Sequence, residues 1–102
     1  MSVASVKSPE RPQLQNLLQR HLENPFLVLE LDPSAGVVEM ERQGQKLLSM
    51  LAAGIAEAQS YSTPLGPCPR SAELVRMAMA ELRDPERRFV HEWWARGWRQ
   101  AP

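Results

Sequence analysis

The sequence predicts an all-α fold with four or five helices in one small domain. Apolar residues recur at helical spacing in three segments, at residues 12–23, 37–60 and 72–83. A capping residue precedes proline at Asn24-Pro25 and again at Asp84-Pro85, as is typical of helix starts. No pair of segments indicates strands. The chain of 102 residues is long enough for one core and too short for two.

The N-terminal part is expected to be a disordered tail followed by an amphipathic helix. Residues 1–11 are polar and show no periodicity. Residues 12–23 then place apolar side chains three and four positions apart, which predicts one helix face. Pro12 suits the first helical turn, where a missing N–H costs nothing. The stripe consists of Leu14, Leu17, Leu18, His21 and Leu22.

A short helix and a turn are expected between residues 24 and 36. Asn24 can cap the helix, and Pro25 can take its first position. Residues 26–29 are all apolar, so periodicity alone does not separate strand from helix, and the Asn-Pro start favours one or two helical turns. The residues DPSAG, at 32–36, predict a turn.

The segment 37–60 is predicted to form one long helix with a single apolar face. Gly44 lies on that face and is expected to let another helix approach closely. Gly54 is expected to end or bend the helix, because glycine costs about 1 kcal/mol relative to alanine in a helix interior. The face consists of Met40, Gly44, Leu47, Leu51 and Ile55, with Leu48 beside it.

Residues 61–70 predict an irregular loop, because three prolines and a glycine fall within ten residues. Ser71 is then expected to be the N-cap of a helix over residues 72–83. The buried stripe of this helix consists of Leu74, Val75, Ala78, Met79 and Leu82.

The stretch LRDPERR predicts a sharp corner between two helices. Pro85 disfavours helical geometry at Asp84, which ends the preceding helix. Asp84 can then cap the next helix, and Glu86 is favourable in its first turn. This last helix is expected to continue until Gly97. Its inward or partly inward residues are expected to be Phe89, Val90, Trp93 and Trp94.

The composition argues against several classes of protein. Twelve basic residues balance twelve acidic ones, so no overall field attracts nucleic acid or an anionic membrane. No apolar run approaches the roughly 20 residues that span a bilayer, and the N-terminus lacks the apolar core of a signal peptide. The single cysteine, Cys68, forms no internal disulfide. The sequence therefore predicts a cytoplasmic protein.

No catalytic or metal site is recognisable. Cys68, His21 and His91 lack the spacing of metal ligands. His91 is expected to be a packed or half-exposed structural histidine, because no serine, cysteine or carboxylate constellation surrounds it. The sequence predicts no enzyme, no metal, no cofactor and no small-molecule substrate.

Arginine and tryptophan alternate near the C-terminus, as in a nucleic-acid-binding surface. Four carboxylates lie among them, which favours a solvated, salt-bridged helix. Because Trp93 and Trp94 point about 100° apart, they are hard to hide together. We expect at least one of Trp94 and Trp98 to face a partner or the N-terminal helix. The alternative is that helix 12–23 folds back and covers all three tryptophans.

Taken in order, these elements resemble a J-domain, the fold of DnaJ-type co-chaperones. NPFLVLEL (24–31) matches the family's opening, QKLLSML (45–51) the end of its second helix, and AMAELRDPERR (78–88) its third helix and corner. The resemblance implies an antiparallel hairpin of the second and third helices within residues 24–98, with 99–102 as a tail. It also implies a structural corner at Asp84, Pro85 and Arg88, and helix 12–23 is an extra amphipathic helix.

The family's His-Pro-Asp tripeptide is missing. Ala52-Ala53-Gly54 stands in its place, and alanine methyls offer no donor, acceptor or charge. In the family this tripeptide stimulates ATP hydrolysis by the DnaK-type chaperone. Basic residues on the second helix are also few, with Arg42 and Lys46 only. The resemblance therefore supports the fold and argues against the usual activity.

The sequence predicts a non-catalytic adaptor that binds protein partners, or a second copy of itself, in a cytoplasmic complex. The binding residues are expected in the proline-rich loop and in the two terminal helices. They are Tyr61, Thr63, Pro64, Leu65, Trp94, Trp98, Leu14, Leu17, Leu18 and Leu22. One alternative is a co-chaperone that engages a DnaK-type chaperone through another surface. A less favoured alternative is a small nucleic-acid-binding domain.

Overall fold

The computed structural model describes the backbone of residues 10–100 and the side-chain environment of residues 16–97. The described chain is mostly helical, as expected, and adds one small two-stranded sheet that the sequence did not predict. In order, the elements are α2 (Glu10–Leu22), α3 (Pro25–Val28), α4 (Val37–Ala52), the 3-10 helix η1 (Ala56–Gln59), β1 (Ser60–Thr63), β2 (Gly66–Pro69), α5 (Ala72–Arg83) and α6 (Pro85–Gln100).

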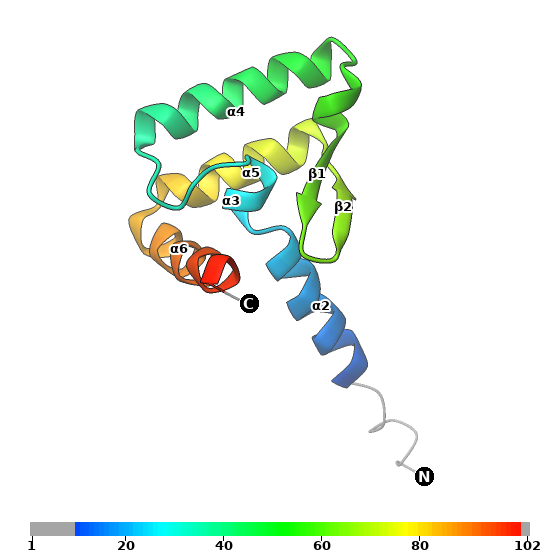
Figure 1. Ribbon diagram of the computed structural model, residues 1–102, viewed down its shortest axis with the longest axis vertical. Coiled ribbons are helices and arrows are strands. Elements are labelled where there is room, and N and C mark those ends of the chain that lie inside the picture. The colour runs from blue at the N-terminus through cyan, green and yellow to red at the C-terminus, as the bar shows by residue number, and fades with distance from the viewer. Residues whose placement is uncertain (1–9, 101–102) are drawn as a thin grey trace.

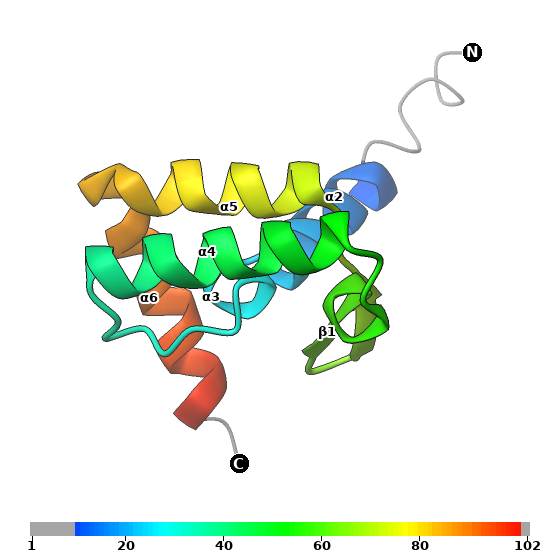
Figure 2. The ribbon, with the colours of Figure 1, turned by 90° about the horizontal axis from the view of Figure 1, so that it is seen from above.

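Helices α4 and α5 lie side by side and run in opposite directions (Figure 1 and Figure 2). Met40 and Leu47 of α4 and Met79 and Leu82 of α5 are buried between them and α3. A Cβ added at Gly44 would lie 2.3 Å from the sulfur of Met79. The close helix approach expected at Gly44 is therefore confirmed.

The short helix α3 forms the centre of the core. Its residues Phe26 and Val28, with Leu29 after it, are almost fully buried. The Asn24 carboxamide oxygen accepts a hydrogen bond from the Phe26 N–H at 2.9 Å, so Asn24 is the expected cap. Its amide nitrogen donates to the carbonyl of His91 at 3.2 Å, which fastens α3 to α6.

Both caps predicted around α5 are present. The Ser71 hydroxyl accepts from the Leu74 N–H at 3.1 Å, and α5 ends at Arg83 as expected. The Asp84 carboxylate accepts from the N–H groups of Glu86 at 3.0 Å and Arg87 at 3.3 Å. These bonds satisfy donors that the first turn of a helix leaves without intrahelical partners.

Arg88 clamps the corner onto a distant turn. Its guanidinium donates to the carbonyls of Pro33 and Ala35, in the turn before α4. It also pairs with Glu92 at 2.7 Å and lies over the ring of Phe26, 5.4 Å from its centroid. The corner therefore joins α5 and α6 to the α3–α4 turn.

The predicted irregular loop is wrong, because residues 60–69 form an antiparallel hairpin. Thr63 pairs with Gly66, and Tyr61 pairs with Cys68. Gly66 has a φ of +112°, which suits glycine, and it follows the two turn residues Pro64 and Leu65. In an antiparallel pair, only every second residue exchanges backbone hydrogen bonds with the opposite strand. Cys68 is at such a position, whereas Pro67 and Pro69 lie at the alternate positions, so strand β2 tolerates their missing N–H groups.

The long helix expected over residues 37–60 is shorter in the structure. Helix α4 ends at Ala52, and Gly54 follows with a φ of +73°. Gly54 was expected either to end the helix or to bend it, and this left-handed glycine ends it. Ile55 was predicted on the apolar face of that helix, but it lies beyond the helix end and is 38% exposed.

Three further boundaries differ from the prediction. Helix α2 begins at Glu10, within the stretch predicted to be a tail, and residues 1–9 lie outside the described part. Helix α6 continues through Gly97 to Gln100, so the predicted stop is wrong. The helix therefore includes residues 99 and 100 of the predicted tail 99–102, and residues 101–102 lie outside the described part. One glycine is not enough to end a helix when the residues after it still favour one.

Candidate interaction surface

Helix α6 presents large apolar side chains to solvent, although they were predicted to lie inward or partly inward. Phe89 is 70% exposed, Trp93 62%, Val90 51% and Trp94 40%. We call these four residues the α6 aromatic face. The opposite side of the helix carries Ala95, which is buried against the core. The face is therefore a contiguous apolar strip on the outside of the molecule.

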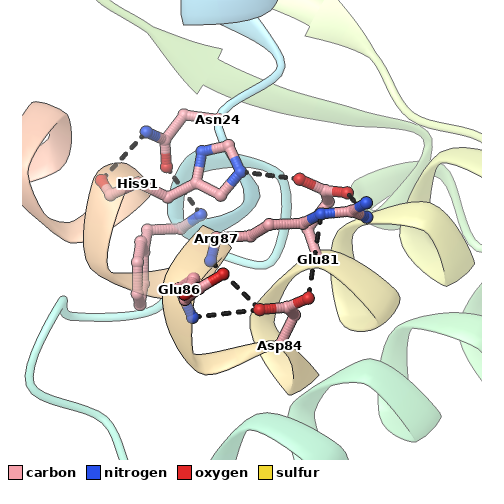
Figure 3. Close-up of polar contacts among 7 residues, drawn as sticks. Asn24, Glu81, Asp84, Glu86, Arg87 and His91 are labelled. Atoms are coloured by element: carbon pink, nitrogen blue, oxygen red, sulfur yellow. Dashed lines mark hydrogen bonds and ion pairs between the residues drawn. The ribbon is translucent and has the colours of Figure 1, made fainter.

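A polar network holds the inner side of α6 in place (Figure 3). The His91 ring nitrogen Nε2 lies 2.9 Å from a Glu81 oxygen, and Arg87 pairs with the other Glu81 oxygen at 2.9 Å. The hydrogen bond with His91, aided by the Arg87 charge, lowers the pKa of the Glu81 carboxyl against a smaller opposing effect of burial. His91 is thus the structural, partly buried histidine that the sequence predicted.

The aromatic face continues toward the C-terminal end of α2. The Trp93 and Trp94 rings meet edge to face, with centroids 5.0 Å apart. Trp94 in turn contacts the ring of His21 on α2, with centroids 4.3 Å apart. The end of α2 is further held by the Tyr61 hydroxyl, which donates to the Leu22 carbonyl at 3.0 Å.

Helix α2 projects away from the rest of the described chain (Figure 1). It leaves Trp93 62% exposed, so the alternative in which it covers all three tryptophans is wrong. Trp94 does face this helix, through His21, as one of its expected positions required. On α2, Leu17 and Leu18 are about half exposed and Leu22 is partly buried. The predicted binding residues Leu14 and Trp98 lie on α2 and α6, but their side chains fall outside the described residues.

The four binding residues predicted in this segment, Tyr61, Thr63, Pro64 and Leu65, differ in their exposure to solvent. Pro64 and Leu65 are exposed at its tip, Leu65 at 67%. The Thr63 hydroxyl donates to the Gly66 carbonyl at 2.6 Å and therefore holds the turn. Tyr61 was expected to face a partner, but it is 3% exposed. It is a core residue because alternate residues of β1 point toward α3 and α5.

The burial of Tyr61 has a measurable consequence at high pH. Tyr61 is the single tyrosine of the chain, and burial raises the pKa of its phenol to about 12. The unfolded value is about 10. The folded state thus holds this proton more tightly, and the resulting stability is fully present below about pH 10 and lost as the pH rises through about 12.

We expect a near-ultraviolet titration to show one tyrosinate transition near pH 12 in the native protein. In urea-unfolded protein the transition should move to about pH 10. Tyr61→Phe is the control, because it removes the transition and keeps the ring. A native transition near pH 10 would contradict the buried position of the phenol.

A buried arginine is the feature that sequence reasoning missed. Arg70 is 5% exposed, and its guanidinium donates to the carbonyls of Val28 at 2.9 Å and Ala58 at 3.1 Å. The third nitrogen pairs with Glu30 at 2.8 Å. Arg70 therefore joins α3, η1 and the end of the hairpin. The sequence offers no signal for this, because an arginine after three loop prolines is ordinarily solvent-exposed.

The arginines near the corner are paired with carboxylates rather than free for phosphates. Arg83 binds both oxygens of Glu41, at 2.7 and 2.9 Å, which lowers the pKa of Glu41 and raises that of Arg83. Arg88 and Arg96 both pair with Glu92. This is the salt-bridged arrangement that the sequence favoured, and it leaves little net positive field.

Candidate metal clusters and membrane-spanning helices are both absent from the described residues. Among them, no cluster of three or more histidine, cysteine or acidic residues could bind a metal ion. Over the same residues, none of the helices combines the length and the apolarity needed to cross a bilayer. Cys68 is partly exposed on β2, where its sulfur lies 4.0 Å from the Thr63 hydroxyl.

Two open hollows on the surface of the described residues are lined partly by carboxylates. One, of about 510 Å³, lies between α3 and β1 and includes Glu30 and Asp32. The other, of about 460 Å³, lies beside α5 and includes Glu23 and Glu73. Each hollow is lined by one serine, Ser62 or Ser71, and by two carboxylates, but by no histidine, lysine or cysteine that would complete a nucleophile and its base. The α6 aromatic face thus stands as the strongest candidate for binding.

Comparisons of the chain with protein-family models, with curated proteins and with solved structures give no match.

Proposed function

We propose that this chain is a non-catalytic protein-interaction module that binds through the α6 aromatic face within a cytoplasmic complex. The observation that carries the proposal is the exposure of Phe89 and Trp93, at 70% and 62%, on a helix fixed from behind. Tryptophan and other large aromatic residues dominate the energy of protein interfaces. Exposed contiguous apolar strips of this kind mark binding surfaces.

The rigidity of α6 supports the proposal. The hydrogen bond from Asn24, the Glu81–His91 contact and the Arg88 clamp all act on the inner side of the helix. A partner that binds the outer side therefore does not have to order the helix first. Preorganisation of this kind improves affinity by reducing the entropy lost on binding.

A J-like scaffold without chaperone activity is part of the proposal. Its support is the order of elements, with a capped α3, an antiparallel α4–α5 pair and a corner anchored by Arg88. Ala52-Ala53-Gly54 ends α4 with exposed, apolar side chains where the family carries His-Pro-Asp. We therefore propose that partners use α6 rather than the end of α4.

The test is a pull-down from the native host with wild-type bait beside Phe89→Ala/Trp93→Ala. Truncating two exposed aromatic residues leaves the core intact, so circular dichroism should be unchanged, whereas bound protein should fall at least tenfold. Met77→Ala is the matched control, because Met77 is 57% exposed but lies on α5. Mass spectrometry identifies what is lost.

Equal recovery by all three baits would refute a binding role for the aromatic face. Recovery of a DnaK-type chaperone by every bait would instead favour the co-chaperone alternative, with a docking surface away from α6. Retention on nucleic acid that falls steeply with salt would favour the remaining alternative.

A further inference from the structure

The exposed side of α6 carries an ordered line of four residues. Glu86, Phe89, Trp93 and Arg96 follow one another at intervals of three, four and three, so they lie along one strip of the helix. All four are exposed, and the strip lies opposite the buried Ala95. The strip is acidic at its N-terminal end, aromatic in the middle and basic at its C-terminal end.

This strip is complementary to itself in the antiparallel sense. The pair Glu86 and Arg96 and the pair Phe89 and Trp93 share one midpoint, at position 91 of the helix. Two copies of α6 can pack antiparallel with a twofold axis that passes level with position 91. This axis places Glu86 opposite Arg96 and Phe89 opposite Trp93 of the second copy. Aromatic residues then meet aromatic residues, and carboxylates meet guanidinium groups.

We infer that the occupant of the α6 aromatic face is a second copy of this chain, bound as an antiparallel α6–α6 pair. Phe89 of one protomer packs against Trp93 of the partner subunit, and Glu86 pairs with Arg96 of the partner subunit. The inference rests on the proposed function, because it uses the same face. A parallel pair would place like charges together at both ends of the strip.

The charged ends of the strip are available for this pairing. Within the described residues, the Glu86 carboxylate makes no ion pair, and its backbone N–H alone is engaged, by Asp84. The Arg96 side chain is 56% exposed, and its ion pair with Glu92 has a distance of 3.5 Å. Both side chains can therefore reach across an interface at little cost.

The extent of the strip indicates a weak dimer. The two exposed rings of the strip, Phe89 and Trp93, offer on the order of 300 Å² between them. A stable interface buries roughly 800 Å² on each partner, and smaller ones belong to transient complexes. We therefore expect reversible dimerisation with a dissociation constant in the micromolar range, more favourable at low salt because rim charges are screened.

The test is sedimentation equilibrium of the full chain at several concentrations and low salt. Glu86→Arg and Arg96→Glu should each weaken the dimer about tenfold, because symmetry makes every single reversal repel at two places. The double variant Glu86→Arg/Arg96→Glu should restore wild-type association. An equimolar mixture of the two single variants should also dimerise. Trp93→Ala should abolish the dimer.

Arg76→Glu is the control, because it reverses an exposed charge on α5, away from the strip. Circular dichroism shows whether each variant keeps its helices. A monomer at every concentration, or single reversals without effect, would overturn the inference. If the chain is monomeric while Phe89→Ala/Trp93→Ala still loses a different protein in the pull-down, the proposed function stands and self-pairing is wrong. If neither assay responds, both fail.

Discussion

Replacing Arg70 with methionine is expected to destabilise the fold by roughly 2–5 kcal/mol. The substitution removes the Arg70 donors from the buried carbonyls of Val28 and Ala58. Each buried acceptor left unpaired costs roughly 1–3 kcal/mol. A small domain has about 5–15 kcal/mol of stability in all, so the loss is a large share. Urea unfolding followed by circular dichroism measures it.

Two matched variants separate the buried bonds from the ion pair. Glu30→Gln removes the charge from a side chain that is 53% exposed, and it should cost less than about 1 kcal/mol. The stability of Arg70→Lys should lie between those of the wild type and Arg70→Met. The planar guanidinium group of arginine reaches three acceptors at once, and the single ammonium group of lysine cannot. A methionine variant within 1 kcal/mol of wild type would show that the two carbonyls do not depend on Arg70.

Replacing Gly44 with valine is expected to destabilise the α4–α5 pair by about 1–3 kcal/mol or more. The new Cβ would lie 2.3, 2.6 and 2.8 Å from three atoms of Met79. Met79 is 2% exposed, so its side chain has no open space into which it can move. Adding Met79→Ala should recover part of the loss, and a double-mutant cycle from thermal unfolding would measure that coupling.

Gly97→Ala is the opposite case and serves as the control. Gly97 also lies inside a helix, but an added Cβ would meet no atom within 4 Å. The alanine should stabilise the protein by up to about 1 kcal/mol, because it gains helix propensity without a clash. If Gly44→Val also stabilised the protein, helix propensity rather than the close approach would govern Gly44.

Local signals were readable from the sequence. The caps at Asn24, Ser71 and Asp84 depend on one side chain and the N–H groups two or three residues later. Such pairings are encoded within a few consecutive residues, so they could be predicted. The close approach at Gly44 was readable for a similar reason, because a glycine on an apolar helix face has few other uses.

The hairpin and the orientation of α6 could not be predicted in the same way. Prolines argue against a strand unless the pairing partner is known, because only the register shows that Pro67 and Pro69 fall at the permitted positions. On α6, the apolar spacing predicts a stripe that lies inward or partly inward, because apolar stripes usually face a core. The inner side is instead polar: the Asn24 side-chain amide donates to the His91 carbonyl, and the Arg88 guanidinium donates to the Pro33 carbonyl.

The long-range bonds around α3 bear on when the chain can fold during synthesis. The small helix is anchored by Arg70, by the carbonyl of His91 and by the ring contact with Arg88, all of which come much later in the sequence. While the ribosome is still making α6, these anchors are absent or confined to the exit tunnel. The core around Phe26 therefore assembles in one cooperative step that has to wait until α6 has emerged from the ribosome.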